Sequence, residues 1–240
     1  MTRRVALIPG GARGIGRGVA LALARRDWDL AIAYRTSAAE AADVVTEAQA
    51  HGARALALKA DVGNAEEAES LVQQAEATLG SIDALIHCAG PYHRVDILDE
   101  TPEGWREMLE SNLSSLFYLA RLVGPTMAGR GWGRIIAFSS AHADLRAAPR
   151  MLAPYQIAKS GLIILARTLA KTLASGGVTV NVIAPGFIDS PDEFSALKQQ
   201  IPAGYEGTVD DAVKLVLFLL SDDARYVNGA NIHLSGAWGL

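Results

Sequence analysis

The sequence predicts an α/β fold, a single Rossmann-type doubly wound seven-stranded parallel sheet with helices on both faces. Short apolar runs recur along the 240 residues, and most are continuous rather than alternating, as is typical of strands covered on both faces. Helical patterns lie between these runs, and such strand–helix alternation implies right-handed crossovers. Because no linker, internal repeat or low-complexity tract interrupts the alternation, we expect residues 1–240 to form one domain.

The expected strands leave room for a helix between each pair. They are Val5–Ile8, Leu30–Tyr34, Arg54–Lys59, Ala84–Cys88, Arg134–Ser139, Thr179–Ala184 and Asn231–Leu234. Capping patterns and a proline at a first helical position indicate helix starts at Ser37-Ala-Ala-Glu40, Asn64-Ala-Glu-Glu67 and Thr101-Pro102. Glycines indicate helix ends at Gly52, Gly80 and Gly176-Gly177.

Composition and charge argue against several classes of function. The formal net charge of −4 disfavours a general affinity for nucleic acid or for an anionic membrane. Cys88 is the only cysteine, so an internal disulfide is impossible and a reducing compartment is expected. The first apolar run is too short for a signal peptide, and no stretch approaches a membrane span. We therefore expect a soluble, cytoplasmic protein.

A glycine cluster where the first strand turns into the first helix indicates a phosphate site. Gly10, Gly14 and Gly16, with Ile15 between the last two, allow a tight turn and admit a pyrophosphate against backbone N–H groups. The alternative is a plain glycine-rich turn. Its position between a strand and a helix favours binding of a dinucleotide cofactor.

The end of the second strand predicts which nucleotide binds. An NAD site usually places an acidic residue there to bind the adenosine ribose, whereas this chain has Arg35, Thr36 and Ser37. Arg35 and the two hydroxyl groups, together with Arg13 of the glycine loop, are suited to a 2′-phosphate. The alternative is that Arg35 is a solvated surface residue. We expect NADP(H).

The ends of the third and fourth strands complete the expected nucleotide site. In Asp61-Val62 the carboxylate is placed to accept a hydrogen bond from the adenine amino group, although Asp is also an ordinary turn residue. The small Ala89-Gly90 pair lets the backbone lie against the cofactor ribose. His87-Cys88 is expected to pack within the sheet rather than to bind a metal, since no matching ligand cluster accompanies it.

Tyr155 and Lys159 predict proton transfer. Four residues apart, they share one face of a helix and lie one turn from each other. A free tyrosine holds its proton until about pH 10, and a neighbouring ammonium favours the phenolate and lowers that pKa. We therefore expect Lys159 to make the Tyr155 hydroxyl a usable acid or base, and the pair with the nucleotide loop indicates a dehydrogenase.

These motifs occur in an order that carries a family resemblance. They are Gly10-x-x-x-Gly14-Ile15-Gly16, Asp61-Val62, Ala89-Gly90, Asn112, Ser139-Ser140, Tyr155-x-x-x-Lys159 and Pro185-Gly186. The chain resembles the short-chain dehydrogenase/reductase family over essentially its whole length. The resemblance implies that Tyr155 exchanges a proton with the substrate oxygen, that Lys159 holds the nicotinamide ribose, and that Ser140 orients the carbonyl. It also implies that Asn112 positions a water relay to Lys159, and that a last group of residues lies over the nicotinamide, namely Pro185, Gly186, Ile188 and Ser190.

Within the family the chain is similar to the β-ketoacyl-acyl-carrier-protein reductases, in Ala184-Pro-Gly-Phe-Ile188 and Ile201-Pro-Ala-Gly204. The resemblance implies reduction of a 3-oxoacyl thioester, with an acidic carrier protein meeting basic residues near the site, here Arg130 and Lys171. The alternative is reduction of another ketone, sugar or pteridine-like substrate, which the long segment before Tyr155 favours. A catalytically silent nucleotide-sensing protein is a third reading, against which the complete catalytic set argues.

Two further expectations concern a loop and the assembly. The segment 141–150 either binds a polar or anionic part of the substrate or is an extended solvated loop, and its polar residues are His142, Asp144, Arg146 and Arg150. The resemblance implies a homotetramer, with contacts through the helices that hold Asn112 and Tyr155 and through the C-terminal strand and tail. The apolar tail 237–240 is consistent with burial by a partner chain.

Overall fold

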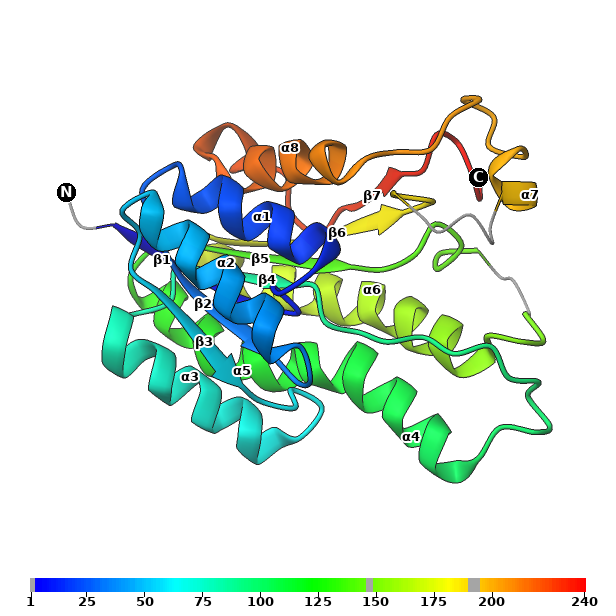
Figure 1. Cartoon of the computed structure of the whole chain (residues 1–240), viewed down its shortest axis with the longest axis horizontal. Coiled ribbons are helices and arrows are strands. Elements are labelled where there is room, and N and C mark those ends of the chain that lie inside the picture. The colour runs from blue at the N-terminus through cyan, green and yellow to red at the C-terminus, as the bar shows by residue number, and fades with distance from the viewer. Residues whose placement is uncertain (1–2, 146–148, 190–194) are drawn as a thin grey trace.

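A parallel sheet forms the centre of the molecule in a computed structural model that describes residues 3–145, 149–189 and 195–240 (Figure 1). The strands are β1 (Arg4–Pro9), β2 (Trp28–Tyr34), β3 (Ala55–Lys59), β4 (Ala84–His87), β5 (Gly133–Phe138), β6 (Val178–Pro185) and β7 (Asn231–Leu234). They form one seven-stranded sheet in the order β3-β2-β1-β4-β5-β6-β7, and every pairing is parallel. The predicted fold class and all seven strands are confirmed, within two residues at each end.

Helices cover both faces of this sheet. They are α1 (Gly14–Ala24), α2 (Ala38–Ala50), α3 (Ala65–Leu79), α4 (Pro102–Leu109), α5 (Ser115–Gly129), α6 (Ala153–Leu173), α7 (Ser195–Lys198) and α8 (Val209–Leu220). In Figure 1, α1, α2 and α8 lie above the sheet, whereas α3, α5 and α6 lie below it. The described residues also include a π-helical turn, Glu110–Ser114, and short 3₁₀ turns at Ala174–Gly176 and Asp222–Ala224.

The hydrophobic core consists of two layers, one on each face of the sheet. Successive residues of β1 alternate between them, because side chains along a strand point to opposite faces. Leu7 packs in the layer between the sheet and helices α3, α5 and α6. Its neighbours Ala6 and Ile8 pack in the layer between the sheet and helices α1, α2 and α8. All three side chains are fully buried. This two-sided burial explains why the strands read as continuous apolar runs.

The helix signals were partly correct. Asn64 accepts from the backbone N–H groups of Glu66 and Glu67, and Thr101 accepts from that of Gly104, with Pro102 at the first helical turn. The helix start predicted at Ser37 is also confirmed, since α2 begins at Ala38, although Ser37 makes no side-chain capping hydrogen bond. A reciprocal capping box that starts α8, between Thr208 and Asp211, was not anticipated.

The strand order places a crevice at the carboxyl ends of β1 and β4. Chain connections leave these adjacent strands in opposite directions across the sheet, which is where open α/β sheets bind ligands. Gly10, just after β1, lies against the backbone of Cys88 and Ala89, just after β4. The two segments predicted to hold the nucleotide therefore meet. No helix among the described residues is long and apolar enough to cross a membrane.

Candidate active site

A cavity of about 390 Å³ opens at this crevice. It brings together most of the residues predicted to hold the cofactor, namely Gly10, Arg13, Gly14, Arg35, Thr36, Ser37, Asp61, Val62, Ala89 and Gly90. Cys88, Pro91 and Ser111, which sequence reasoning did not assign to the cofactor, also line it. Residues from four separate strand ends thus converge on one concave surface.

The glycine turn is shaped by close backbone approach. Gly10 has φ +76°, and a Cβ there would stand 2.8 Å from the carbonyl oxygen of Cys88 and the nitrogen of Ala89. Gly16, in the first turn of α1, packs so closely on the Gly10 carbonyl that a Cβ would overlap it. Ile15 lies beside it, half-buried against the core layer under α1. The turn therefore forms a backbone-lined cradle at a helix N-terminus, which suits a pyrophosphate.

Both predicted arginines lie at the adenosine end of the cavity, and both face carboxylates. Arg35 Nη1 donates to Glu107 Oε1 at 3.0 Å and lies 3.6 Å from Asp61 Oδ2. Arg13 Nη1 is 4.0 Å from Glu40 Oε1. These side chains are all exposed, so the ion pairs are weak and a phosphate can compete for the guanidinium groups. The Glu107 partner, on α4, was invisible in the sequence because it is distant along the chain.

Tyr155 and Lys159 lie in the first turns of α6, as their spacing predicted. Lys159 Nζ lies 5.6 Å from the centre of the Tyr155 ring and donates to the carbonyl oxygen of Phe138 at 2.8 Å. Lys159 is only 4% exposed, and burial lowers its pKa to about 8. The Lys159 ammonium group therefore lies in a poorly solvated place.

The expected lowering of the Tyr155 pKa is not present in this structure. Burial, followed by proximity to Tyr92, raises the pKa of Tyr155 to about 12. The physical reason is that desolvation penalises the phenolate, and the Lys159 ammonium is held at the Phe138 carbonyl. Tyr155 in this state is a protonated phenol that holds its proton more tightly than a free tyrosine does, so proton donation requires that its phenolate be stabilised when substrate and cofactor bind.

Ser140 and Asn112 each carry a buried polar atom that lacks a partner among the described residues. Ser140 Oγ, just after β5, makes no hydrogen bond there, and neither does Asn112 Oδ1. Asn112 Nδ2 donates to the carbonyl oxygens of Pro91 at 2.9 Å and Met108 at 3.1 Å, and the residue lies in the π-helical turn. Buried polar atoms normally have partners, so both atoms indicate places for a ligand or water.

Gly90 connects the nucleotide cavity to these catalytic side chains. A Cβ at Gly90 would overlap Asn112 Oδ1 and stand 3.3 Å from Lys159 Nζ. Gly90 also lines the nucleotide cavity. Only a residue without a side chain fits between the cavity and these two side chains.

His87 and Cys88 pack as expected. Ser115 Oγ donates to the Ser111 carbonyl at 2.8 Å, so it accepts from His87 Nε2, which lies 2.8 Å away. Burial lowers the pKa of His87 to about 3 and raises that of the Cys88 thiol to about 12. Both side chains are neutral at physiological pH.

The segment predicted to lie over the nicotinamide is tied to the end of the sheet. The Pro185 carbonyl accepts from Ala141 N at 3.0 Å, and Gly186 N donates to the Leu234 carbonyl at 3.0 Å. Ile188 forms a bridge with Gly207. Ser190, the remaining predicted residue of this segment, lies outside the described residues.

The polar residues after Ser140 contact their own chain. The ring of His142 packs edge-on against Trp238 at 5.4 Å, and Asp144 accepts from Asn231 and His233 at 3.1 and 2.9 Å. Arg150 pairs with Asp96. The segment is therefore attached to the rest of the chain and is not simply a solvated loop. Its expected contact with the substrate stays a prediction, and Arg146 lies outside the described residues. Trp238 also packs on Phe187, so its own chain covers the tail residue expected to need a partner.

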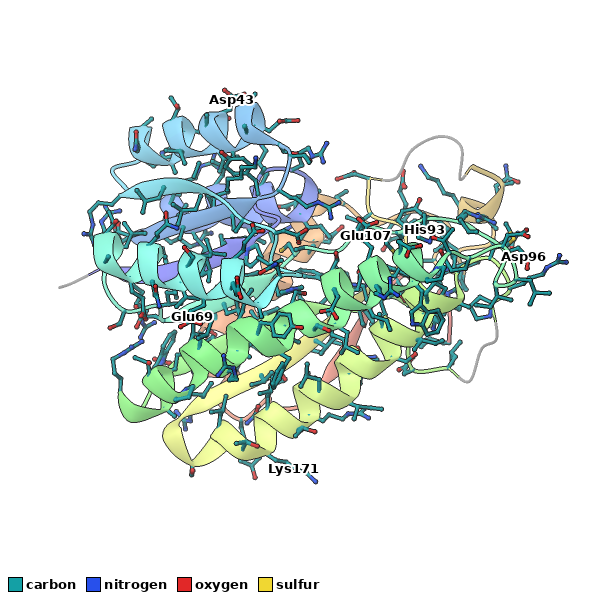
Figure 2. The ribbon with its side chains drawn as sticks, turned by 90° about the horizontal axis from the view of Figure 1, so that it is seen from below. Asp43, Glu69, His93, Asp96, Glu107 and Lys171 are labelled. Carbon is teal, nitrogen blue, oxygen red and sulfur yellow. The ribbon has the colours of Figure 1, made fainter. Side chains whose placement is uncertain are left out.

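The two basic residues expected near the mouth of the site lie elsewhere. Arg130 donates to Ile82 O and Asp83 Oδ1, just before β4 begins, and therefore lies at the amino ends of the strands. Lys171 projects near the C-terminal end of α6, sixteen residues or about 24 Å along the helix from Tyr155 (Figure 2). Neither residue therefore lies at the mouth of this chain's own site, and their contact with a carrier protein stays a prediction.

Comparisons with known proteins agree with this geometry. Residues 10–237 match the family model described as enoyl-(acyl carrier protein) reductase. The chain is 35% identical to 3-oxoacyl-[acyl-carrier-protein] reductase FabG of Staphylococcus aureus, over 96% of each chain. It is 34% identical to the Escherichia coli protein of the same name, over 97% of this chain and 96% of the other. A blue fluorescent protein from a metagenomic library, solved in complex with NADPH, superposes with a TM-score of 0.92 at 31% identity, over 99% and 98% of the chains.

Proposed function

This chain belongs to the short-chain dehydrogenase/reductase family, and we propose that it is an NADPH-dependent carbonyl reductase whose substrate is a 3-oxoacyl thioester. Members of the family are oxidoreductases that act on the CH–OH/C=O pair with a nicotinamide cofactor. One observation carries the proposal. Gly90, which lines the cavity that gathers the predicted cofactor residues, also packs directly against Asn112 and Lys159.

The residues present fit a dinucleotide cofactor. The glycine cradle at Gly10 and Gly16 leaves no room for side chains, and the N-terminus of α1 follows it, which suits a pyrophosphate. The unpartnered Ser140 Oγ and Asn112 Oδ1 lie at the other end of the site. Pro185 at the end of β6, with Gly186 and Ile188 after it, would face the nicotinamide.

The choice of NADPH rests on charge. Two arginines and two hydroxyl side chains line the adenosine end of the cavity, Arg13, Arg35, Thr36 and Ser37, and a 2′-phosphate would meet both guanidinium groups. A solved structure that resembles this chain contains NADPH, which agrees with the proposal.

The chain's residues supply the proton and orient the substrate. When bound, the reduced nicotinamide supplies a hydride to the carbonyl carbon. Tyr155 donates its phenolic proton to the carbonyl oxygen, so the C=O group becomes CH–OH and the phenolate is left on Tyr155. Ser140 Oγ, which has no described partner, donates a hydrogen bond to the same oxygen and stabilises its developing charge. Lys159 stabilises the phenolate, and Asn112 holds the water from which Tyr155 is reprotonated.

A second candidate is the NADPH-dependent reduction of another ketone, sugar or pteridine-like substrate. The observation that favours it is the position of Arg130 and Lys171, which lie away from the mouth of the site. These two residues therefore give no support to docking of a carrier protein at this chain's own site. A small or coenzyme A-bound carbonyl compound remains compatible with the site.

Turnover of acetoacetyl-CoA with NADPH tests the proposal. We expect a kcat/KM at least tenfold higher with NADPH than with NADH, and loss of turnover in Tyr155→Phe with NADPH binding unchanged. Absence of turnover with every 3-oxoacyl thioester, alongside reduction of a free ketone, would select the second candidate. Activity retained in Tyr155→Phe would contradict the mechanism, and full binding without any turnover of carbonyl compounds would point to a nucleotide sensor.

The proposal includes the wider organisation of the protein. The chain would act as one domain, residues 1–240, in which the nucleotide site and the catalytic residues share a single sheet. A cytoplasmic homotetramer is expected from the family, with apolar side chains such as Phe117 on α5 and Ile164 on α6 exposed for contact with another copy. Gel filtration with light scattering tests the assembly.

A further inference from the structure

An exposed tyrosine stands beside the proposed catalytic acid. The rings of Tyr92 and Tyr155 are 6.0 Å apart, centre to centre, and tilted by 57°. Tyr92 is 51% exposed, so about half of its surface is available to a ligand. Tyr92 follows Pro91, whose carbonyl oxygen accepts a hydrogen bond from Asn112 Nδ2. This hydrogen bond helps to fix the backbone just before Tyr92. No role was assigned to Tyr92 from the sequence.

The segment that carries Tyr92 is braced, although it is a loop. It connects β4 to α4 and extends past the carboxyl ends of the strands, where Figure 2 places His93 and Asp96. His93 Nε2 lies 2.6 Å from Glu100 Oε2, and Asp96 pairs with Arg150. Contacts at both ends therefore hold the loop in place beside the catalytic residues.

Backbone hydrogen bonds join this segment to the residues that precede α6. Val95 N donates to the Met151 carbonyl at 3.0 Å, and Ile97 N donates to the Arg150 carbonyl at 3.1 Å. The two segments thus form a short wall next to the start of α6, where Tyr155 lies. A wall fixed in this way can hold a substrate in one orientation.

Large apolar side chains are exposed on the wall, beside charged ones such as Arg150. Twelve large hydrophobic side chains are exposed in the described part of the chain, and four belong to the two segments of the wall, namely Tyr92, Ile97, Leu98 and Met151. Exposed apolar surface that gathers in one place commonly marks a binding site. Tyr92 is the member of this group that contacts the Tyr155 ring.

We propose that Tyr92 is a specificity-determining residue, whose ring contacts an apolar group attached to the carbonyl carbon of the substrate. The inference rests on the proposed function, and it narrows the substrate class to carbonyl compounds with an alkyl chain or ring next to the reacting group. The rim side chains Ile97, Leu98 and Met151 would cover the more distant carbons of that group. Removal of the Tyr92 ring would expose the apolar group of the substrate to water but leave Tyr155, Lys159 and Ser140 in place.

Chain-length selectivity measures this contact. With 3-oxoacyl-CoA substrates of four, six and eight carbons, the wild-type kcat/KM should rise about tenfold along the series, since each buried carbon adds to binding. In Tyr92→Ala the rise should shrink to about twofold, mainly through KM for the longer substrates. In Tyr92→Phe, which keeps the ring, most of the rise should remain.

Two controls separate this contact from a structural effect. Tyr226 is 98% exposed and lies in the segment that enters β7 at the amino ends of the strands, so Tyr226→Ala should leave the selectivity unchanged. NADPH affinity, measured by fluorescence titration, should be the same in all four proteins.

Several outcomes would overturn the inference. They are a Tyr92→Ala enzyme that keeps the tenfold rise, and a Tyr92→Phe enzyme that loses as much selectivity as Tyr92→Ala. If the wild type reduces no 3-oxoacyl thioester, the proposed substrate fails. The same comparison with methyl ketones of four to eight carbons then tests Tyr92 independently of that failure.

Discussion

Replacing Lys159 by methionine removes a buried ammonium group but keeps an unbranched side chain of similar length. Burial lowers the pKa of Lys159 from 10.5 to about 8. At about 1.36 kcal/mol for each pKa unit, the buried charge costs about 3 kcal/mol of stability at neutral pH. The methionine variant avoids this cost but loses the hydrogen bond to the Phe138 carbonyl, which lowers its stability by about 1–2 kcal/mol. We therefore expect Lys159→Met to be inactive and yet more stable, by about 1–2 kcal/mol.

The pH dependence of this difference is the sharper test. Between pH 8 and 10.5 the unfolded wild-type chain binds the Lys159 proton and the folded chain releases it. The wild type therefore gains stability as the pH rises through this range, whereas the methionine variant has no such proton and lacks this pH dependence. Above pH 10.5 the lysine is neutral in both states and keeps its hydrogen bond, so the wild type should become the more stable protein.

Thermal unfolding of both proteins without cofactor, at pH 7 and at pH 10.5, measures the effect. At about 2–4 °C for each kcal/mol in a chain of this size, the variant should melt about 2–8 °C above the wild type at pH 7. The sign should reverse at the higher pH. A difference that is independent of pH, or a wild type that is more stable at pH 7, would refute the reasoning about the buried ammonium.

Three other substitutions test separate parts of the structure. Gly90→Ala places a Cβ on Asn112 Oδ1, at φ +147°, so we expect kcat/KM to fall at least about 100-fold while circular dichroism still shows a folded protein. Arg35→Ala should weaken NADPH binding about tenfold and NADH binding less than threefold in fluorescence titrations; an equal loss for both would place the 2′-phosphate elsewhere. Thr208→Ala removes the capping box of α8 and should lower the unfolding free energy by about 1 kcal/mol in urea, whereas Thr46→Ala, in the exposed middle of α2, should not.

The parts of the site predicted from the sequence are those that local spacing encodes. The strands are continuous apolar runs because each is covered on both faces, and the glycine loop follows β1 because only small residues fit there. Tyr155 and Lys159 share a helix face because the helix period dictates it. Such features need only a few neighbouring residues, so a single sequence contains them.

Other features depend on which distant segments meet. The lowered pKa of Lys159 and the raised pKa of Tyr155 follow from burial, which no spacing reveals. Arg35 pairs with Glu107 across 72 residues. The placement of Arg130 and Lys171 at the far end of the sheet shows the same limit, since their positions along the chain did not reveal their distance from the site.

The sequence by itself determined the fold class, the order of strands and helices, and the chemical groups available for a nicotinamide-dependent reaction. The tertiary structure alone decided that Gly90, which lines the cavity, packs against Asn112 and Lys159, and that the ring of Tyr92 lies beside that of Tyr155. The physical reason is one of range. Backbone conformation and periodic burial are set by residues within a turn or strand, whereas solvation, pKa and pocket shape are set by packing between elements distant in the chain.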